Sequence, residues 1–305
     1  MTTPAADVAL ADAFFAEARE ATDAALECTL DAVLDGAPDA LASAIRYAVL
    51  GSGKRFRPAL VIAAYRTGGG ANPRITDLAA AVEIVHAYSL VHDDLPCMDN
   101  DDLRRGRPTL HRAHGVRRAT VAGFAMVPVA AAAVGRAAGA LGLDPEPSRA
   151  IHRCLWTAAG AGGMIGGQVL DLLAGGHDVS LAGITDLEAR KTGALIAASV
   201  EIGAIAAGVT PAQRHAYRAF GADVGLAFQI ADDVLDLTAT KSELGKTPGK
   251  DAKLGKPTFP TVLGVDAAQL EAERLAERAV AHLADAGVSS PLLAALARFV
   301  VARRS

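Results

Sequence analysis

Two groups of aspartates carry the strongest chemical signal in the sequence. The first group falls within ten residues, directly after the apolar run 83–91, and consists of Asp93, Asp94, Asp99, Asp101 and Asp102. Two unit charges about 4 Å apart repel by roughly 4 kcal/mol at an effective dielectric constant of about 20. A cation must offset that repulsion if the carboxylates converge, and Mg²⁺ prefers hard oxygen ligands while leaving room for phosphate oxygens. A solvated acidic loop is the alternative interpretation of this group alone.

The second group of aspartates makes the metal interpretation the stronger one. Asp232, Asp233 and Asp236 lie in an apolar run, and Asp232 and Asp236 are four residues apart, which places them on one helix face. A solvated helix face would carry interleaved Lys or Arg, but none follows until Lys241. Two carboxylate groups on two apolar helices therefore predict a shared metal site between those helices.

Basic residues follow both acidic groups and also open a helix near the N-terminus. Gly51, Ser52 and Gly53 form a turn before a predicted helix, and the cations after that turn are Lys54, Arg55 and Arg57. A helix N-terminus favours anions, and Arg binds phosphate through two hydrogen bonds. The turn lacks the spacing of a nucleotide-binding P-loop. Further cations are Arg104, Arg105, Arg107, Lys191, Lys246, Lys250, Lys253 and Lys256. This distribution predicts a diphosphate held by metal and basic side chains, with the lysines after residue 240 in a closing lid.

Helical periodicity dominates the elements that must position these residues. Ala and Leu recur in long blocks bounded by Gly or Pro, and aromatic residues make up only 4% of the chain. We expect helices over residues 6–33, 38–50, 56–67, 76–95, 116–139, 147–172, 184–208, 212–238, 259–283 and 289–303. No linker or change in composition divides the chain. The sequence predicts an all-α fold in a single domain, residues 1–305.

Composition excludes several other classes of protein. The 305 residues carry a net charge of −4, so no basic excess indicates nucleic-acid binding. Three widely spaced cysteines exclude a disulfide framework and a thiolate zinc site. The acidic N-terminus does not resemble a signal peptide. The longest apolar stretch, residues 119–135, is Ala-rich and is interpreted as a buried bundle helix rather than a membrane span. We expect a cytoplasmic protein.

The motifs taken together resemble those of the trans-type isoprenyl diphosphate synthases of the polyprenyl synthetase family. The resemblance runs from about residue 40 to 303 and rests on the segments G-S-G-K-R-F-R-P, H-A-Y-S-L-V-H-D-D-L-P-C-M-D-N-D-D-L-R-R-G-R-P-T-L-H, G-G-Q-V-L-D, K-T-G-A-L-I, F-Q-I-A-D-D-V-L-D and L-G-K-P-T-F-P. It implies an antiparallel helical bundle around a deep central cavity, and a homodimer. It also implies that the two acidic motifs face each other across the cavity mouth and hold three Mg²⁺ ions on an allylic diphosphate.

The resemblance assigns roles to individual residues. It makes Asp93, Asp99 and Asp232 the metal ligands, supported by Asp94, Asp233 and Asp236. The isopentenyl diphosphate would be bound by Lys54, Arg57, His86 and Arg105, and the allylic diphosphate by Arg104, Lys191, Lys246 and Lys256. Lys191, Thr192 and Gln229 would line the reacting centre, where a hydroxyl and an amide dipole can stabilise a carbocation.

The implied reaction needs neither a nucleophile nor a dedicated base. The allylic C–O bond ionises when metal and cations neutralise the leaving diphosphate, and the isopentenyl double bond attacks the resulting cation. An apolar cavity protects that cation from water. Tyr88 lies five residues before Asp93, about one and a half helical turns deeper, and beside it Ser89 is too small to close the cavity. In the family an aromatic residue there goes with farnesyl diphosphate (C15), so we expect that product, with geranylgeranyl diphosphate (C20) as the alternative.

One stretch departs from the family pattern. The family usually has an acidic residue after Gly115 and later a Gly-Asp pair, whereas this chain has Val116 and Gly123-Phe124. This departure leaves product length open, and it leaves open a non-catalytic subunit of a heteromeric synthase. Such subunits lose acidic motifs, however, and this chain retains both. A class I terpene cyclase is disfavoured, because its second motif would differ and it would lack a diphosphate site at Lys54 and Arg57.

Overall fold

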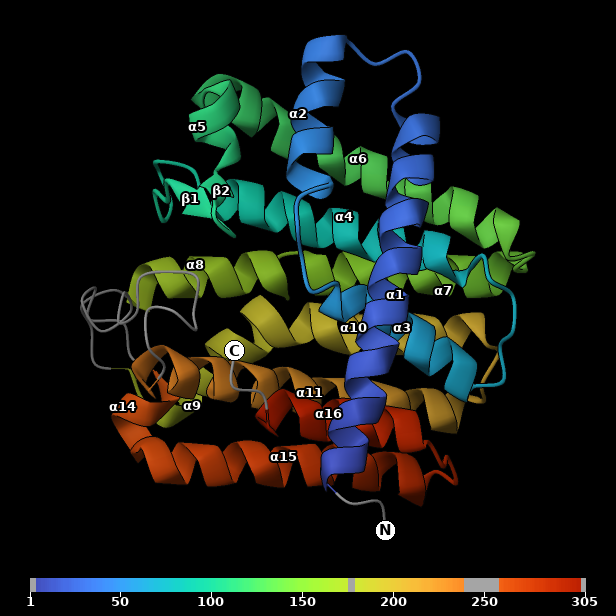
Figure 1. Ribbon diagram of the computed structural model, residues 1–305, viewed down its shortest axis with the longest axis vertical. Coiled ribbons are helices and arrows are strands. Elements are labelled where there is room, and N and C mark those ends of the chain that lie inside the picture. Colours follow the sequence, from blue (N-terminus) through green and yellow to red (C-terminus); the bar gives the residue numbers. More distant parts are fainter. Residues whose placement is uncertain (1–3, 175–178, 239–257, 303–305) are drawn as a thin grey trace.

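The computed structural model describes residues 4–174, 179–238 and 258–302. In these residues the regular elements are helices, apart from one hairpin of two short strands (Figure 1). The prediction of an all-α fold is confirmed. The elements are α1 (Pro4–Val33), α2 (Asp39–Val49), α3 (Phe56–Thr67), α4 (Ile75–Asp93), β1 (Leu103–Arg104), β2 (Arg107–Pro108), α5 (Leu110–His114), α6 (Val116–Ala140), α7 (Pro145–Ala159), α8 (Met164–Ala174), α9 (Leu181–Glu188), the π-helix η1 (Ala189–Gly193), α10 (Ala194–Ala206), α11 (Pro211–Thr238), α14 (Phe259–Leu263), α15 (Val265–Asp285) and α16 (Pro291–Ala302).

The long helices are stacked side by side, and α1 crosses them (Figure 1). In the middle of the stack α4 packs against α3 and α6, while α11 packs against α10 and α15. Small residues on the inner faces allow close packing: Ala79, Ala80 and Ala81 of α4 are all fully buried. The C-terminal ends of α4 and α11, where the two acidic motifs lie, point to the same side of the bundle (Figure 1).

Three predicted helices are each divided in the structure. The helix expected over 147–172 is two helices, α7 and α8, because Gly160, Gly162 and Gly163 form a turn between them. The helix expected over 259–283 is α14 and α15, separated by Gly264, whose φ of 84° favours glycine. The helix expected over 184–208 contains the π-helix η1 between α9 and α10. Sequence periodicity did not reveal these breaks because the apolar pattern continues across them.

A short β-hairpin follows the first acidic motif and was not predicted. In it Leu103 pairs with Pro108 and Arg104 pairs with Arg107. The two residues between the strands, Arg105 and Gly106, have φ values of 53° and 75°, the signature of a tight type I′ turn. The Tyr47 hydroxyl donates a hydrogen bond of 2.7 Å to the Pro108 carbonyl, which fixes the hairpin to α2. The turn therefore presents Arg105 from a fixed position.

The Ala-rich helix α6 is only half buried, which corrects the expectation that residues 119–135 are a buried helix. One face packs on α4, and the other exposes Val121 and Phe124, which are 55% and 67% exposed. By length and composition α6 could span a membrane, and within the described residues it is the one helix that could. Its exposed apolar face is a candidate contact surface.

Gly203 of α10 marks a close approach between α10 and α3. A Cβ atom at this position would lie 2.3 Å from the backbone oxygen of Val61 and 2.9 Å from Cβ of Ala64. Because a backbone atom cannot rotate away, Gly203→Ala should force the helices apart. We expect a loss of about 2 kcal/mol in the free energy of unfolding, or a melting temperature about 5 °C lower. An unchanged melting temperature would show that the α3–α10 contact is loose.

Candidate functional site

A cavity of about 1130 Å³ brings the two acidic motifs together. Asp93, Asp99 and Asp232 all line it, although Asp93 and Asp232 are far apart in the sequence. Asp94, Asp233 and Asp236 are buried and do not belong to the lining. Each motif thus places aspartates on the cavity wall and others in the protein behind it.

The first motif combines a cavity-facing carboxylate with a buried one that is already paired. Burial raises the pKa of Asp93 to about 6, against the lowering effect of Lys191, while nearby Asp99 raises it further. Asp94 is held by the guanidinium of Arg104, whose Nε donates to Asp94 Oδ1 over 3.0 Å. The ionised form of Asp93 is therefore less favoured than that of a solvent-exposed aspartate. A divalent ion bound there would favour the ionised carboxylate.

The second motif is held in place through Asp233. Its carboxylate accepts hydrogen bonds from Gln229 Nε2 at 2.8 Å and from the backbone N–H of Phe259 at 3.2 Å. Gln229 Oε1 in turn accepts a hydrogen bond from the Thr192 hydroxyl at 3.2 Å. This chain of bonds links α11 to α14 and η1 and fixes the helix turn that carries Asp232.

Basic residues line the same cavity. Lys54, Arg57, His86 and Arg105, expected from sequence at one diphosphate, all line it. Arg57 Nη1 lies 3.4 Å from His86 Nε2, and Arg57 Nε is buried without a partner. Burial, and after it the charge of Arg105, lowers the pKa of Arg57 to about 10. Burial followed by the charge of Arg57 lowers the pKa of His86 well below its usual value. An anion entering here would relieve this crowding of positive charge.

The expected ligands of the second diphosphate are only partly described by the structure. Arg104 and Lys191 both line the cavity, and each is paired with a carboxylate, Arg104 with Asp94 and Lys191 with Asp171 at 2.5 Å. Lys191 and Thr192 lie in the π-helix η1, a distortion that is frequent at functional sites. The predicted ligands Lys246 and Lys256 lie outside the described residues.

Three residues around the cavity were given no role from sequence. Asp171 pairs with Lys191, and Glu83 pairs with Arg55 at 2.7 Å. Gln168 lines the cavity, is 8% exposed, and has both side-chain polar atoms buried without a partner. A buried amide whose nitrogen and oxygen both lack a hydrogen-bond partner indicates a position where a ligand or a water molecule forms those hydrogen bonds. Gln168 and Asp171 belong to the segment G-G-Q-V-L-D, whose polar residues were the available signal.

Tyr88 and Ser89, the residues expected to control chain length, both line the cavity. The Tyr88 ring is buried against the ring of His92, with centroids 5.9 Å apart, and its hydroxyl donates to the Ala159 carbonyl over 3.5 Å. Burial, with a smaller effect from Asp93, raises the pKa of Tyr88 to about 12, so the hydroxyl stays neutral. Tyr88 thus presents a large neutral ring to the cavity.

Gly123 and Phe124, where the chain departs from the family pattern, contact the outer side of this region. A Cβ on Gly123 would lie 2.1 Å from His92 Nε2, so the glycine provides the space that the imidazole occupies. The Phe124 ring packs edge-on against His92, with centroids 5.6 Å apart, while most of its surface stays exposed on α6. Phe124 is not among the residues that line the cavity. The departure therefore changes the support of His92 rather than the cavity wall.

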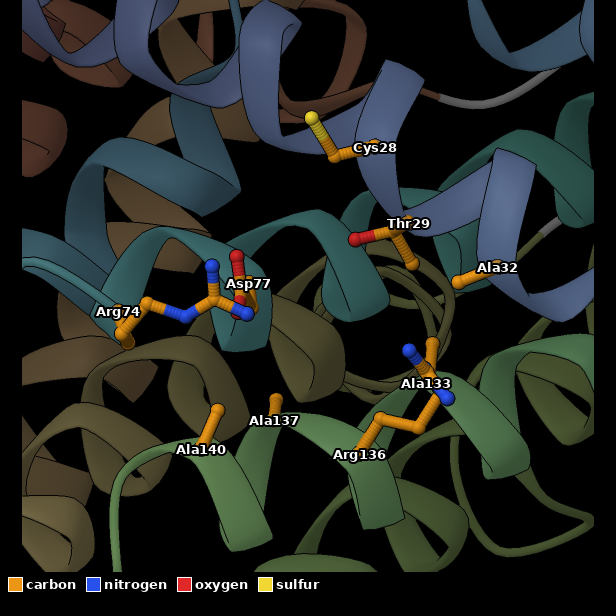
Figure 2. A pocket seen from close by; sticks show the side chains of 9 residues that line it. All are labelled: Cys28, Thr29, Ala32, Arg74, Asp77, Ala133, Arg136, Ala137 and Ala140. Carbon is orange, nitrogen blue, oxygen red and sulfur yellow. The ribbon is translucent and has the colours of Figure 1, made fainter.

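A second, smaller pocket of about 270 Å³ lies at the opposite end of α4 (Figure 2). Figure 2 shows Arg74 beside Asp77, with their 2.6 Å ion pair, and Cys28 on the neighbouring α1. The pocket is lined from α1, α4 and α6 and contains none of the residues that the sequence singled out. The chemistry expected from sequence is thus concentrated in the large cavity.

Comparison with known proteins agrees with this geometry. Residues 38–289 match the family model described as Polyprenyl synthetase. A relative named geranylgeranyl pyrophosphate synthase, chloroplastic, from Catharanthus roseus is 41% identical over 276 residues, which are 90% of this chain and 76% of the relative.

Two solved structures are similar over nearly their whole length. An FPP/GFPP synthase from Zymomonas mobilis has a TM-score of 0.78 and 33% identity, covering 94% of this chain and 100% of that one. A geranyltransferase from Helicobacter pylori, complexed with magnesium and isoprenyl diphosphate, has a TM-score of 0.77 and 30% identity, covering 96% and 95%.

Proposed function

Because the chain belongs to the polyprenyl synthetase family, a family of prenyltransferases, we propose that it condenses isopentenyl diphosphate with a short allylic diphosphate and releases diphosphate. The observation that carries the proposal is a single cavity lined both by carboxylates of the two acidic motifs and by Lys54, Arg57, His86 and Arg105. A cavity with carboxylates for metal and a separate set of basic residues suits two diphosphates of different roles.

The carboxylates fit Mg²⁺, because they supply hard oxygen ligands and because burial, which raises the pKa of Asp93, disfavours an ionised carboxylate that a bound cation would stabilise. Asp93, Asp99 and Asp232 would hold the ions, with Asp94, Asp233 and Asp236 in support, and we propose three ions. Bound Mg²⁺ would neutralise the leaving diphosphate. Among cations of the chain, Arg104, Lys191, Lys246 and Lys256 would share that task. The magnesium in the Helicobacter pylori structure supports this assignment.

Residues of the chain would then orient the reactants and stabilise the cation. Lys54, Arg57, His86 and Arg105 would fix isopentenyl diphosphate with its double bond toward the allylic carbon. Thr192 and Gln229, joined by their hydrogen bond, direct oxygen dipoles that can stabilise positive charge next to Lys191. The apolar lining, which includes Phe228 and Met164, excludes water from the cation.

Farnesyl diphosphate is the product that we propose. Its support is the buried Tyr88 ring on the cavity wall, one and a half turns below Asp93. Geranylgeranyl diphosphate is the alternative, because the relative from Catharanthus roseus carries that name.

We further propose that the chain acts as a single domain, in the cytoplasm, and as a homodimer. The apolar face of α6, with Val121 and Phe124 exposed, supports a contact between two copies. A second copy on this face would also cover Phe124 and thereby fix His92 from outside. A non-catalytic role within a heteromeric synthase would instead require a different partner for activity.

The purified chain incubated alone with isopentenyl diphosphate, Mg²⁺ and either dimethylallyl, geranyl or farnesyl diphosphate tests the proposal. We expect turnover with dimethylallyl and geranyl diphosphates, farnesyl diphosphate as the final product, and no turnover when EDTA removes the metal. Activity that appears only with an added partner would contradict the proposal, and so would cyclic products formed from the allylic substrate alone.

A further inference from the structure

Arg55 lies between the two basic residues proposed to bind isopentenyl diphosphate, Lys54 and Arg57, and it too lines the large cavity, but its guanidinium is bonded to other groups of the protein. The guanidinium donates to Asp23 Oδ1 on α1 and to Glu83 Oε1 on α4, both at 2.7 Å. Its Nη2 donates to the carbonyls of Val49 at 3.3 Å and Gly51 at 2.8 Å. The side chain is 3% exposed, so these four bonds occupy a group that bulk solvent does not reach.

The turn before α3 is held from a second direction by Arg105. Its Nη1 donates to the Ser52 carbonyl over 2.9 Å, and a Cβ on Gly53 would lie within 2.4 Å of the same nitrogen. In a trans peptide the N–H points away from the carbonyl of the same unit. Two guanidinium groups that bind the carbonyls of Gly51 and Ser52 therefore also set the direction of the next two N–H groups. Ser52 and Gly53 line the large cavity.

Glu83 is the carboxylate that allows these arginines to lie together. Its side chain is 3% exposed, and besides the ion pair with Arg55 it raises the pKa of Arg57 and Arg105 against the burial that lowers them. Glu83 itself lines the cavity. A negative charge in a site that binds an anion would weaken binding unless it performed another task.

The backbone of Arg55 supplies an independent sign that the position is functional. Its φ of 49° and ψ of 40° are left-handed, a conformation that a residue with a long side chain rarely adopts. Such conformations persist where surrounding contacts determine them, and they cluster at functional sites. Here the left-handed residue is the N-cap of α3, the point at which the chain turns from Lys54 into the helix that carries Arg57.

We propose that Arg55, anchored by Glu83, is a positioning residue for the isopentenyl diphosphate site and does not itself contact the diphosphate. The pair fixes the turn 51–54 and the start of α3, so that Lys54 and Arg57 are already placed before the substrate arrives. Glu83 compensates the charge of three arginines at the site and keeps the guanidinium of Arg55 bonded to the protein rather than to the anion. This inference rests on the proposed function, because it requires isopentenyl diphosphate to bind at Lys54 and Arg57.

Binding of isopentenyl diphosphate in EDTA, measured by calorimetry, isolates this site, because the allylic site needs metal. We expect Arg55→Lys and Glu83→Gln each to weaken that binding about tenfold, as a misplaced binding group does. In steady-state assays the KM for isopentenyl diphosphate should rise by a similar factor, while the KM for geranyl diphosphate stays within about twofold. The direction for Glu83→Gln is decisive, since a carboxylate that acted only by repelling the anion would give tighter binding when removed.

Each single variant could lose binding by unfolding, because it leaves one buried charge without its partner. The double variant Arg55→Gln with Glu83→Gln avoids this, because it removes both buried charges of the ion pair. It should fold and still bind weakly. Arg214→Lys is the matched control. Arg214 forms a 2.7 Å ion pair with the buried Glu201, and neither residue lines the cavity, so this substitution should leave binding unchanged. Parent-like binding by the double variant, or tighter binding by Glu83→Gln, would overturn the inference. Parent-like binding by Lys54→Ala with Arg57→Ala would instead overturn the proposed site.

Discussion

Asp232→Asn should lower kcat about a thousandfold, with the fold unchanged. The substitution keeps the shape of the side chain and removes one oxygen charge from the cavity wall where both acidic motifs meet. A metal that polarises a leaving group contributes several kcal/mol to transition-state stabilisation, and about 4 kcal/mol corresponds to a thousandfold in rate. Asp93→Asn should act in the same direction, because Asp93 faces the same cavity from α4. Single-turnover formation of product from geranyl diphosphate at saturating Mg²⁺ measures the effect.

Asp102→Asn is the matched control for this loss of activity. Asp102 belongs to the same acidic run as Asp93, but its carboxylate is 64% exposed, pairs with Arg112 at 3.1 Å and does not line the cavity. Its replacement should leave kcat within about twofold, because exposed ion pairs contribute little. Metal-free binding of isopentenyl diphosphate should survive in Asp232→Asn as well, since the basic residues of the cavity remain. If Asp232→Asn keeps a tenth of the parent activity, the aspartates are not the metal site.

The fold was largely predictable from the sequence because its signal is local. Ala- and Leu-rich blocks bounded by glycine or proline predicted the long helices, including α3 over the same residues, 56–67. Breaks inside apolar runs were not predictable in the same way. The division at Gly264 depends on its positive φ, and the π-helix at Lys191 depends on packing against α8, where Gly167 allows the backbones to approach. The first is a local backbone conformation and the second a tertiary contact, and hydrophobic periodicity contains neither.

The sequence predicted which residues belong to the candidate site, but it did not predict the separate role of each. Spacing and residue type singled out the two acidic groups, the family resemblance selected Asp93 and Asp232 within them, and the fold places both on one cavity. Three cations in four positions likewise suggested that Arg55 is equivalent to its neighbours, whereas the structure directs it to Glu83. The distinction arises from the left-handed backbone at Arg55 and from a carboxylate 28 residues away. A buried partner that is distant in sequence leaves no local pattern.

Tyr88→Ala should change the main product from C15 to C20 and longer chains. The Tyr88 ring is buried on the cavity wall against His92, about 7.5 Å below Asp93 along α4 at 1.5 Å per residue. On the proposed function the growing chain would extend from the acidic motif into the apolar cavity, and the truncation would remove a large ring from the cavity wall. The expected result is a longer product with a similar rate for the first condensation, since no diphosphate or metal ligand is touched. Labelled isopentenyl diphosphate with chromatography of the dephosphorylated products measures it.

Tyr88→Phe separates the ring from the hydroxyl in this prediction. The hydroxyl makes one long bond, 3.5 Å to the Ala159 carbonyl, so its removal should leave both the ring position and the C15 product unchanged. Phe124→Ala provides the second comparison, because Phe124 supports His92 from outside the cavity and should lengthen products less than Tyr88→Ala. Products of Tyr88→Ala no longer than those of the parent would show that the floor of the cavity lies elsewhere.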